Sequence, residues 1–237
     1  FLSRVVEILE EEVEENGDMK HDLSGSIRLE NVSFSYTKDS KRVLSDINIQ
    51  INKGEKIAIV GSSGSGKSTL SKLLIGLFPP TTGKILFDAL DYDSLDKQYL
   101  RQQIGIVPQD MTLFNKTIFE NIAGDFPVSH EEMVEVCKLV NIHHEIMEMP
   151  MEYNTLVSEM GMNLSGGQRQ RIILARALIK KPKIILLDEA TSYLDNVNEK
   201  EIMQRFKDQN ITIIVIAHRL STIIDSDQIF VMKKERL

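Results

Sequence analysis

The spacing of apolar residues divides the first part of the chain into strands. Residues 26–36 alternate apolar and polar side chains with a slip near Asn31, which predicts a strand with a bulge. Residues 43–51 alternate again, and the continuous apolar run 57–60 stops at Gly61. A short run of this kind is typical of a strand buried on both faces.

Helices are predicted where apolar residues recur every three or four positions. This spacing covers residues 1–15, 67–78 and 117–150. Ser-x-x-Glu at 129–132 and Ser-x-x-Gln at 165–168 have the form of capping boxes, and the second opens a further helix.

Strands and helices alternate in the last third of the chain. Apolar runs at 183–188, 211–217 and 228–232 predict strands, and a helix is expected from about Asp195. Such alternation implies a parallel sheet covered by helices on both faces, so the predicted fold class is α/β.

A glycine-rich loop separates the buried run 57–60 from the helix that follows it. Its sequence, GSSGSGKS, matches G-x-x-x-x-G-K-[ST] in full. Glycine amides and the helix N-terminus converge on a polyanion, Lys67 reaches the β- and γ-phosphates, and the Ser68 hydroxyl coordinates Mg²⁺. A glycine turn without a ligand is the alternative. The predicted phosphate-binding residues are Gly61, Ser62, Ser63, Gly64, Ser65, Gly66, Lys67, Ser68 and Thr69.

Two carboxylates follow the buried strand 183–188. Asp188 stands at its carboxyl end, where ligands bind in open α/β sheets, and is the expected Mg²⁺ partner. Glu189 comes next and would act as general base on a water beside the γ-phosphate. Two acidic residues in an ordinary turn are the alternative, which the phosphate loop disfavours.

The order of these motifs resembles one family. GSSGSGKST, LSGGQ at 164–168, IILLDEATSYLD at 184–195 and IAHR at 216–219 are spaced as in the nucleotide-binding domains of ABC transporters. LSGGQ is the specific signal, because a phosphate loop alone indicates only a P-loop ATPase. The resemblance runs from about Ile27 to Met232.

The resemblance implies an architecture and roles for further residues. It implies a P-loop NTPase core with a mostly parallel sheet, an antiparallel β subdomain on the N-terminal side and a helical subdomain at about 110–170. Tyr36 resembles the aromatic residue that stacks on adenine, with a core aromatic as its alternative. The expected catalytic residues are Glu189, His218 and Gln109, and the expected Mg²⁺ contacts are Ser68, Gln109 and Asp188.

The second glycine turn, NLSGGQRQR, is explained by a partner. In the family that the chain resembles, two domains pack head to tail, and LSGGQ of one faces ATP held by the phosphate loop of the other. A helix N-terminus suits a γ-phosphate, and twofold symmetry gives two equivalent sites. The residues expected to act across this interface are Ser165, Gly166, Gly167, Gln168 and Asp195.

Composition and charge narrow the class of protein. The net charge of −7 disfavours a broad nucleic-acid surface, so no nucleic-acid partner is expected. The single cysteine, Cys137, excludes an internal disulfide and is expected to be a small buried side chain on a helix. No apolar run reaches the roughly 18 residues that a membrane-spanning helix needs.

Details of the motifs resemble exporters. The run DMTLFNKTIFENIAGD after Gln109 and the run EMGMNLSGGQ, with Glu159 in the exporter loop that touches the membrane domain, carry this resemblance. FLSRVVEIL and MPMEYNTLVSEMG look most like the peptidase-containing exporters of bacteriocins and competence peptides, so a peptide cargo is expected. Multidrug and lipid exporters are the alternatives, followed by chromosome-maintenance and translation-factor ATPases and by a binding module without hydrolysis.

The domain expectation follows from the same resemblance. Residues 1–24 are expected to link a transmembrane domain to a nucleotide-binding domain at 25–237, and a start at Phe1 suggests a fragment of a longer protein. We expect the domain to work as a homodimer at the cytoplasmic face of the membrane, with ATP and Mg²⁺ as its cofactors. Tyr193 departs from the small residue that is more usual at its position.

Overall fold

The fold is built on two sheets. The computed structural model describes residues 14–37, 40–110, 112–188, 194–217 and 220–233. An antiparallel sheet has the order β2-β1-β4-β5, with the strands Leu44–Ile51, Ile27–Phe34, Thr82–Phe87 and Leu90–Asp91. A parallel sheet has the order β6-β7-β8-β3-β9, with the strands Ile104–Val107, Ile184–Asp188, Thr212–Ile216, Lys56–Gly61 and Gln228–Met232.

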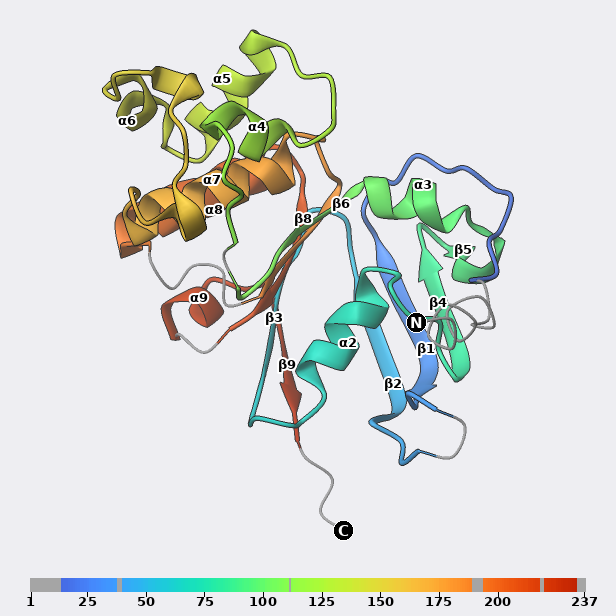
Figure 1. Cartoon of the computed structure of the whole chain (residues 1–237). Coiled ribbons are helices and arrows are strands. Elements are labelled where there is room, and N and C mark those ends of the chain that lie inside the picture. Colours follow the sequence, from blue (N-terminus) through green and yellow to red (C-terminus); the bar gives the residue numbers. More distant parts are fainter. Residues whose placement is uncertain (1–13, 38–39, 111, 189–193, 218–219, 234–237) are drawn as a thin grey trace, which may run out of the picture.

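Helices cover the parallel sheet on both sides (Figure 1). Helices α4 to α8 form one layer, and α2 lies on the other side with the antiparallel sheet beyond it. The predicted α/β class, with its antiparallel and helical parts, is confirmed. The helices are α2 Lys67–Leu74, α3 Lys97–Gln102, α4 Ile118–Ala123, α5 His130–Leu139, α6 His143–Met147, α7 Gly166–Leu178, α8 Asn196–Asp208 and α9 Leu220–Ile224. Short 3₁₀ turns occupy Tyr92–Ser94, Glu152–Asn154 and Glu159–Gly161.

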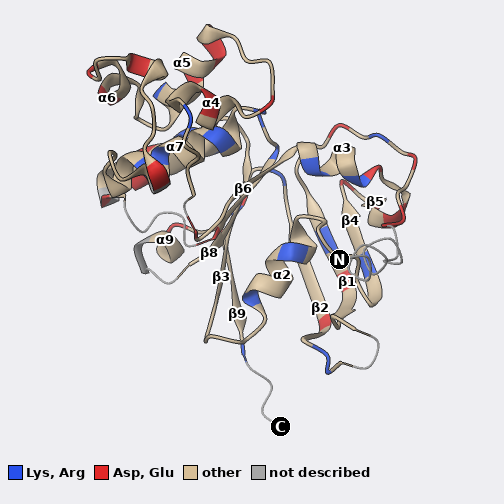
Figure 2. Cartoon of the chain, in the orientation of Figure 1, with Lys and Arg blue, Asp and Glu red and all other residues tan. Residues whose placement is uncertain are grey.

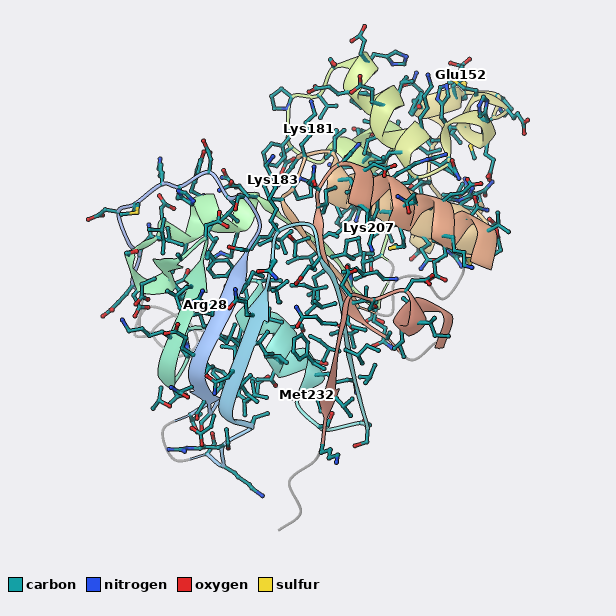
Figure 3. All side chains as sticks on the ribbon, turned by 180° about the vertical axis from the view of Figure 1, so that it is seen from behind. Arg28, Glu152, Lys181, Lys183, Lys207 and Met232 are labelled. Carbon is teal, nitrogen blue, oxygen red and sulfur yellow. The ribbon has the colours of Figure 1, made fainter. Side chains whose placement is uncertain are left out.

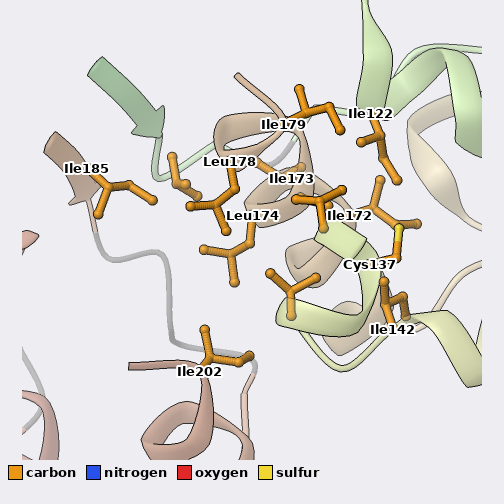
Figure 4. Packing of buried hydrophobic residues seen from close by; sticks show 14 of the residues in the cluster. Ile122, Cys137, Ile142, Ile172, Ile173, Leu174, Leu178, Ile179, Ile185 and Ile202 are labelled. Atoms are coloured by element: carbon orange, nitrogen blue, oxygen red, sulfur yellow. The ribbon is translucent and has the colours of Figure 1, made fainter. Parts of the chain in front are cut away.

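The parallel strands alternate their side chains between two cores. Ile185 and Leu187 of β7 pack with the helical layer, whereas Ile184 and Leu186 pack with α2 and the antiparallel sheet. Figure 4 shows the first of these clusters, in which Cys137 of α5 lies beside Ile142 and the side chains of α7. The expectation of a buried Cys137 is confirmed, and its burial raises the pKa of the thiol to about 12. The strands β7, β8 and β3 are therefore buried on both faces, which explains their continuous apolar runs, whereas Ile229 and Val231 of the edge strand β9 are exposed.

The bulge expected in the first strand is present. Leu29 pairs with Ile49, but the next pair is Val32 with Ile47, so between these two pairs β1 carries one residue more than β2. Asn31 takes up the extra length with a φ of 48°. The shift keeps Leu29 and Val32 on the buried face.

The helices predicted at 67–78 and 117–150 are shorter than the pattern indicates. Helix α2 ends at Leu74, because Gly76 adopts a φ of 64° and closes a Schellman turn in which the Leu77 amide donates to the Lys72 carbonyl at 2.9 Å. The stretch 117–150 is divided into α4, α5 and α6. Capping boxes begin α4 at Thr117 and α5 at Ser129, and the second confirms the box predicted there.

The N-terminal segment crosses the antiparallel part of the domain. Residues 1–13 lie outside the described residues, so the helix expected there is not described. The part that is described, from Glu14 onward, is held against α3: Arg101 donates both guanidinium nitrogens to Glu14 at 2.8 and 2.7 Å. The segment predicted as a linker is thus fixed to the domain that it enters.

Charged residues of both signs are interspersed over the molecule. In the face that Figure 2 shows, lysines and arginines of the helical layer lie among aspartates and glutamates. Charges of both signs are thus mixed along the ribbon of this layer.

Asp88, in the turn between β4 and β5, generates a prediction about pH. Burial raises the pKa of this carboxyl, but hydrogen bonds from the hydroxyls and amides of Ser24 and Ser26 outweigh that and lower the pKa to about 2. Because the pKa is lower in the folded than in the unfolded chain, the stabilisation is complete above about pH 4 and is lost as the pH falls toward 2.

Asp88→Asn should therefore lower the free energy of unfolding at pH 7 by about 1 kcal/mol, allowing for solvent screening of a partly exposed group. The variant should also flatten the loss of stability between pH 4 and 2. Urea denaturation across this range is the measurement, with the exposed Asp93→Asn as control. Equal pH profiles for Asp88→Asn and the parent chain would contradict the assignment.

Candidate functional site

The predicted chemistry gathers at one edge of the parallel sheet. In Figure 3, Lys183 lies just before β7 near one end of the sheet, and Met232, the last residue of β9, lies at the other end. Asp188 and Ile59 are both in register with Ile216 of the intervening strand β8. Because neighbouring strands are about 4.8 Å apart, Asp188 lies roughly 10 Å across the edge from β3, which runs into the glycine loop.

The glycine loop leaves the helix α2 without a side-chain cap. Gly66 is the N-cap residue with a φ of 95°, a conformation that a residue with a β-carbon rarely adopts, and no side chain caps the helix. A β-carbon added to Gly64 would meet no atom within 4 Å, so the loop is open to one side. Uncapped amides at a helix N-terminus bind anions.

Two polar side chains of the loop are placed for a ligand. The Lys67 ammonium donates to the carbonyls of Gly61 and Ser62 at 2.8 and 3.1 Å, which leaves its third hydrogen for an anion. Among the described residues, the buried Ser65 hydroxyl has no hydrogen-bond partner. A phosphate oxygen would satisfy both groups, so the loop fits the polyanion that its sequence predicts.

Close packing explains the first glycine of the loop. A β-carbon on Gly61 would lie 2.4 Å from the Met232 carbonyl oxygen of the neighbouring strand β9. The chain can leave β3 into the loop only with glycine at this position.

Two basic residues lie near the loop: Lys41 and Arg42 line a cavity of about 390 Å³ beside Gly64 and Ser65. Sequence analysis missed these two residues, because no motif marks them.

Tyr36 stands at the surface beside the loop. The residue is 51 % exposed, so it is not a core aromatic. The ring is held edge-on against Phe34 and Phe78 at centroid distances of 5.0 and 5.8 Å, and its hydroxyl lies 3.0 Å from the Thr69 hydroxyl at the start of α2. A fixed, exposed ring next to a phosphate loop is suited to stacking on a base.

The second glycine turn forms a complete cap on α7. The Ser165 hydroxyl accepts the Gln168 amide at 3.1 Å, and the Gln168 side-chain oxygen accepts the Ser165 amide at 2.9 Å, as the predicted capping box requires. Ser165 is exposed, and Gly166 and Gly167 are half-buried. The turn thus presents a helix N-terminus with one exposed hydroxyl.

The two glycine turns belong to different layers. Side chains of α7 pack in the core cluster of the helical layer, whereas those of α2 pack in the cluster on the other side of the sheet. Figure 1 shows α7 and α2 separated by the parallel sheet. The chain therefore brings Tyr36, the phosphate loop and Asp188 to one region and holds the signature turn apart from them.

Asp195 begins α8 and caps it. One oxygen of its carboxylate accepts the amides of Val197 and Asn198 at 3.0 Å each, and the other accepts the Asn198 side-chain amide at 2.6 Å. These hydrogen bonds hold the pKa of the Asp195 carboxyl below its usual range, and the bond from the Asn198 backbone amide contributes most. Asp195 is ionised at neutral pH and fixed in direction.

The remaining predicted residues are described in part. Glu189 and His218, like Tyr193, lie outside the described residues. Gln109 is exposed two residues beyond the end of β6, at the same edge as Asp188, which is half-buried. Within the described part of the chain, no group of three or more His, Cys, Asp or Glu side chains could hold a metal by itself. A Mg²⁺ ion held by phosphates needs only one or two protein ligands, which Ser68 and Asp188 would supply.

Comparison with known proteins decides the family. Residues 44–192, well over half of the chain, match the ABC transporter family. The chain belongs to the ABC transporter family. This ABC domain is of the exporter type and is the part that binds and hydrolyses ATP.

The relatives of this ABC domain are longer proteins. It is 48 % identical over 216 residues to the leukotoxin translocation ATP-binding protein LktB of Mannheimia glucosida, covering 90 % of this chain and 30 % of that protein. It is 44 % identical over 236 residues to the alpha-hemolysin translocation ATP-binding protein HlyB of Escherichia coli O157:H7, covering 98 % and 33 %. The chain spans about a third of the length of these curated relatives.

A solved structure has the same fold. A bacterial Atm1-family ABC exporter with ATP bound matches with a TM-score of 0.86 and 38 % identity, over 100 % of this chain and 42 % of that one. In the described part of this ABC domain, no helix has the length and apolar character that crossing a membrane requires.

Tyr36 offers a test of base stacking. Tyr36→Ala should weaken ATP binding about tenfold or more, because stacking on an aromatic ring contributes about 1–3 kcal/mol per base. Tyr36→Phe keeps the ring and loses only the contact with Thr69, so its affinity should stay within about threefold of the parent chain. Titration with a fluorescent ATP analogue is the measurement. Equal losses in both variants would show that the hydroxyl, not the ring, holds the nucleotide site together.

Proposed function

We propose that this chain is one half of an ATP-driven motor, in which two copies pack head to tail around two ATP molecules. The observation that supports it is the separation of the two glycine turns. The phosphate loop is open at Gly64 on one side of the sheet, and the signature turn presents Ser165 from the helical layer. Each turn suits the phosphate end of ATP, but one chain does not bring them together.

Each chain contributes different groups to the composite site. Amides of the phosphate loop, Lys67 and the Ser68 hydroxyl bind the phosphates, and Tyr36 orients the base. Ser165 and the amides of Gly166 and Gly167 approach the γ-phosphate from the partner chain, with Asp195 beside them. Mg²⁺ bound at Ser68, Asp188 and Gln109 would neutralise phosphate charge.

Hydrolysis and movement follow from this arrangement. Glu189 accepts a proton from the attacking water, and His218 and Gln109 orient the γ-phosphate and the water. ATP favours the closed dimer because it adds contacts that the open state lacks, and loss of the γ-phosphate removes them. Opening and closing drive the attached membrane domain.

The setting of this motor is proposed from its relatives. We place it at the cytoplasmic face of a membrane, joined to a transmembrane domain that selects the cargo. The names of the two curated relatives refer to translocation of a leukotoxin and an alpha-hemolysin, which favours a secreted polypeptide over a drug or a lipid. A bacteriocin or signalling peptide is the finer form of this proposal, and a multidrug or lipid exporter is the alternative.

Replacement of the general base tests the hydrolytic step. Glu189→Gln should bind ATP with the affinity of the parent chain, lower turnover at least 100-fold and accumulate ATP-bound dimers in size-exclusion chromatography, because the amide cannot accept the proton. Glu152→Gln, at an exposed glutamate of the helical layer, is the control and should leave turnover unchanged. Hydrolysis by Glu189→Gln at the parent rate would exclude Glu189 as the base.

Replacement of the signature serine tests the contribution of the partner chain. Ser165→Arg should leave ATP binding to the monomer intact and block dimer closure and turnover, because a long side chain fills the space for the partner's ATP. Ser129→Arg is a matched control, since Ser129 forms the same capping box on α5. Both variants lose a cap, worth about 1 kcal/mol, but only Ser165→Arg should lose activity. Turnover by Ser165→Arg equal to that of the control would contradict the composite site.

A further inference from the structure

A chain of hydrogen bonds begins at the signature turn. The Gln168 side-chain amide donates to Glu145 of α6 at 3.0 Å. Arg171, one turn further along α7, donates to both oxygens of the same carboxylate at 2.6 and 3.1 Å. Glu145 therefore joins two residues of the first turns of α7 and fixes the direction in which that helix begins.

The series of hydrogen bonds continues to the connection between α5 and α6. Arg171 is 9 % exposed, and it also donates to the Asn141 carbonyl at 2.7 Å. Asn141 has a φ of 57°, and its amide donates to the Lys138 carbonyl at 3.2 Å. The left-handed turn at Asn141 directs its carbonyl to α7 and its side chain elsewhere.

The Asn141 side chain reaches α8. Its amide nitrogen donates to Glu201 at 2.8 Å and to the Asn198 side-chain oxygen at 3.2 Å, and its oxygen accepts from Arg205 at 2.6 Å. Asn198 in turn donates to the Asp195 carboxylate at 2.6 Å. We call the connected set of Gln168, Glu145, Arg171, Asn141, Asn198 and Asp195 the Asn141 relay.

We propose that Asn141 is a positioning residue that holds the signature turn and Asp195 in one fixed arrangement, ready for the ATP of a partner chain. The inference rests on the proposed head-to-tail dimer. Ser165 and Asp195 stand on different helices, α7 and α8, and both are expected at the same partner surface. The Asn141 relay is a polar connection that sets α7 against α8, beside the bonds that Arg205 of α8 donates to the Lys138 and Leu139 carbonyls at 2.7 and 3.0 Å.

The Asn141 side chain makes three of the hydrogen bonds to α8, and the backbone carbonyls of Lys138 and Leu139 accept two more from Arg205. Glycine would adopt a φ of 57° without strain, yet it would lose all three hydrogen bonds to α8. The apolar cluster beneath the helices would remain, because Cys137 and Ile142 on either side of the turn are fully buried in it. Loss of the side chain should thus loosen the orientation of α7 relative to α8 while the fold persists.

The effect on dimer formation can be estimated. Only protomers in which α7 and α8 have the orientation required for dimerisation can bind a partner. The apparent dissociation constant therefore equals the intrinsic one divided by the fraction of protomers in that orientation. Both protomers must be competent, so the fraction enters twice. If loss of the Asn141 side chain lowers it to about one third, the apparent dissociation constant of the dimer rises about ninefold.

The experiment compares Asn141→Gly with Asn210→Gly. Asn210 has nearly the same backbone, with a φ of 56°, but it is exposed and outside the Asn141 relay, so its replacement controls for the glycine itself. ATPase activity is measured against protein concentration, together with ATP affinity of the monomer and the melting temperature. Asn141→Gly should need about tenfold more protein for half-maximal activity and keep the turnover per closed dimer and the monomer affinity; Asn210→Gly should match the parent chain.

A second variant distinguishes the loss of hydrogen bonds to α8 from a folding defect. Asn141→Asp keeps the size and tolerance for left-handed backbone, but it loses the donor and sets a negative charge against Glu201. It should shift the concentration dependence in the same direction as Asn141→Gly. Equal concentration dependence of both Asn141 variants and Asn210→Gly would overturn the proposal, and so would a loss of monomer ATP affinity as large as the loss of dimerisation.

A distance measurement tests the orientation directly. Spin labels on Glu152→Cys, an exposed site on the α7 side of the helical layer seen in Figure 3, and on Gln204→Cys, an exposed site on α8, report the placement of that side of the layer relative to α8. The distance distribution should broaden in Asn141→Gly and not in Asn210→Gly. If Ser165→Arg retained activity, the composite site itself would be wrong; if Ser165→Arg blocked activity while Asn141→Gly behaved as its control, only the positioning role would fail.

Discussion

The parallel sheet is the constraint on which the rest of the molecule depends. Its central strands bury side chains on both faces, so polar chemistry is placed where the strands end. At the carboxyl edge, β3 ends at Gly61, where the phosphate loop begins, and β7 ends at Asp188. The glycine loop is then shaped by its contacts with the sheet, as the close approach of Gly61 to β9 illustrates.

The same sheet divides the nucleotide chemistry between two layers. Because α2 and α7 pack against opposite faces, the helix N-termini that they offer to phosphate do not meet within one chain. In the proposed dimer a partner combines them, and the accuracy of that combination would depend on how α7 is held. Hydrogen bonds through Glu145 and Asn141 connect it to α8, in addition to the apolar cluster that both helices share.

Local signals in the sequence were sufficient for the fold class, and the site residues that they predict stay predictions. The apolar runs marked β3, β7 and β8, the glycines marked the loop, and two Ser-x-x-Glu/Gln patterns marked helix starts that the structure confirms. The pattern failed where tertiary turns decided the outcome: Gly76 ended α2 early, and β4, β6 and α3 were not delimited. The relay could not be predicted, because its polar residues lie on three helices and the connection between α5 and α6, and no spacing along the chain brings Glu145 to Gln168 or Asn141 to Asn198.

The capping of α7 refines what each signature residue can do. Both ends of the Gln168 carboxamide are engaged, by the Ser165 amide and by Glu145, so this side chain supports a positioning role rather than direct contact with nucleotide. Ser165 differs, because a hydroxyl that accepts one hydrogen bond in a cap keeps its own hydrogen for donation to an anion. The two glycines that follow expose their amides beside it at the positive end of the helix. A capped helix start and a phosphate-binding half-site are therefore one structure: the cap fixes the turn, and the groups that it leaves unused are those that face outward.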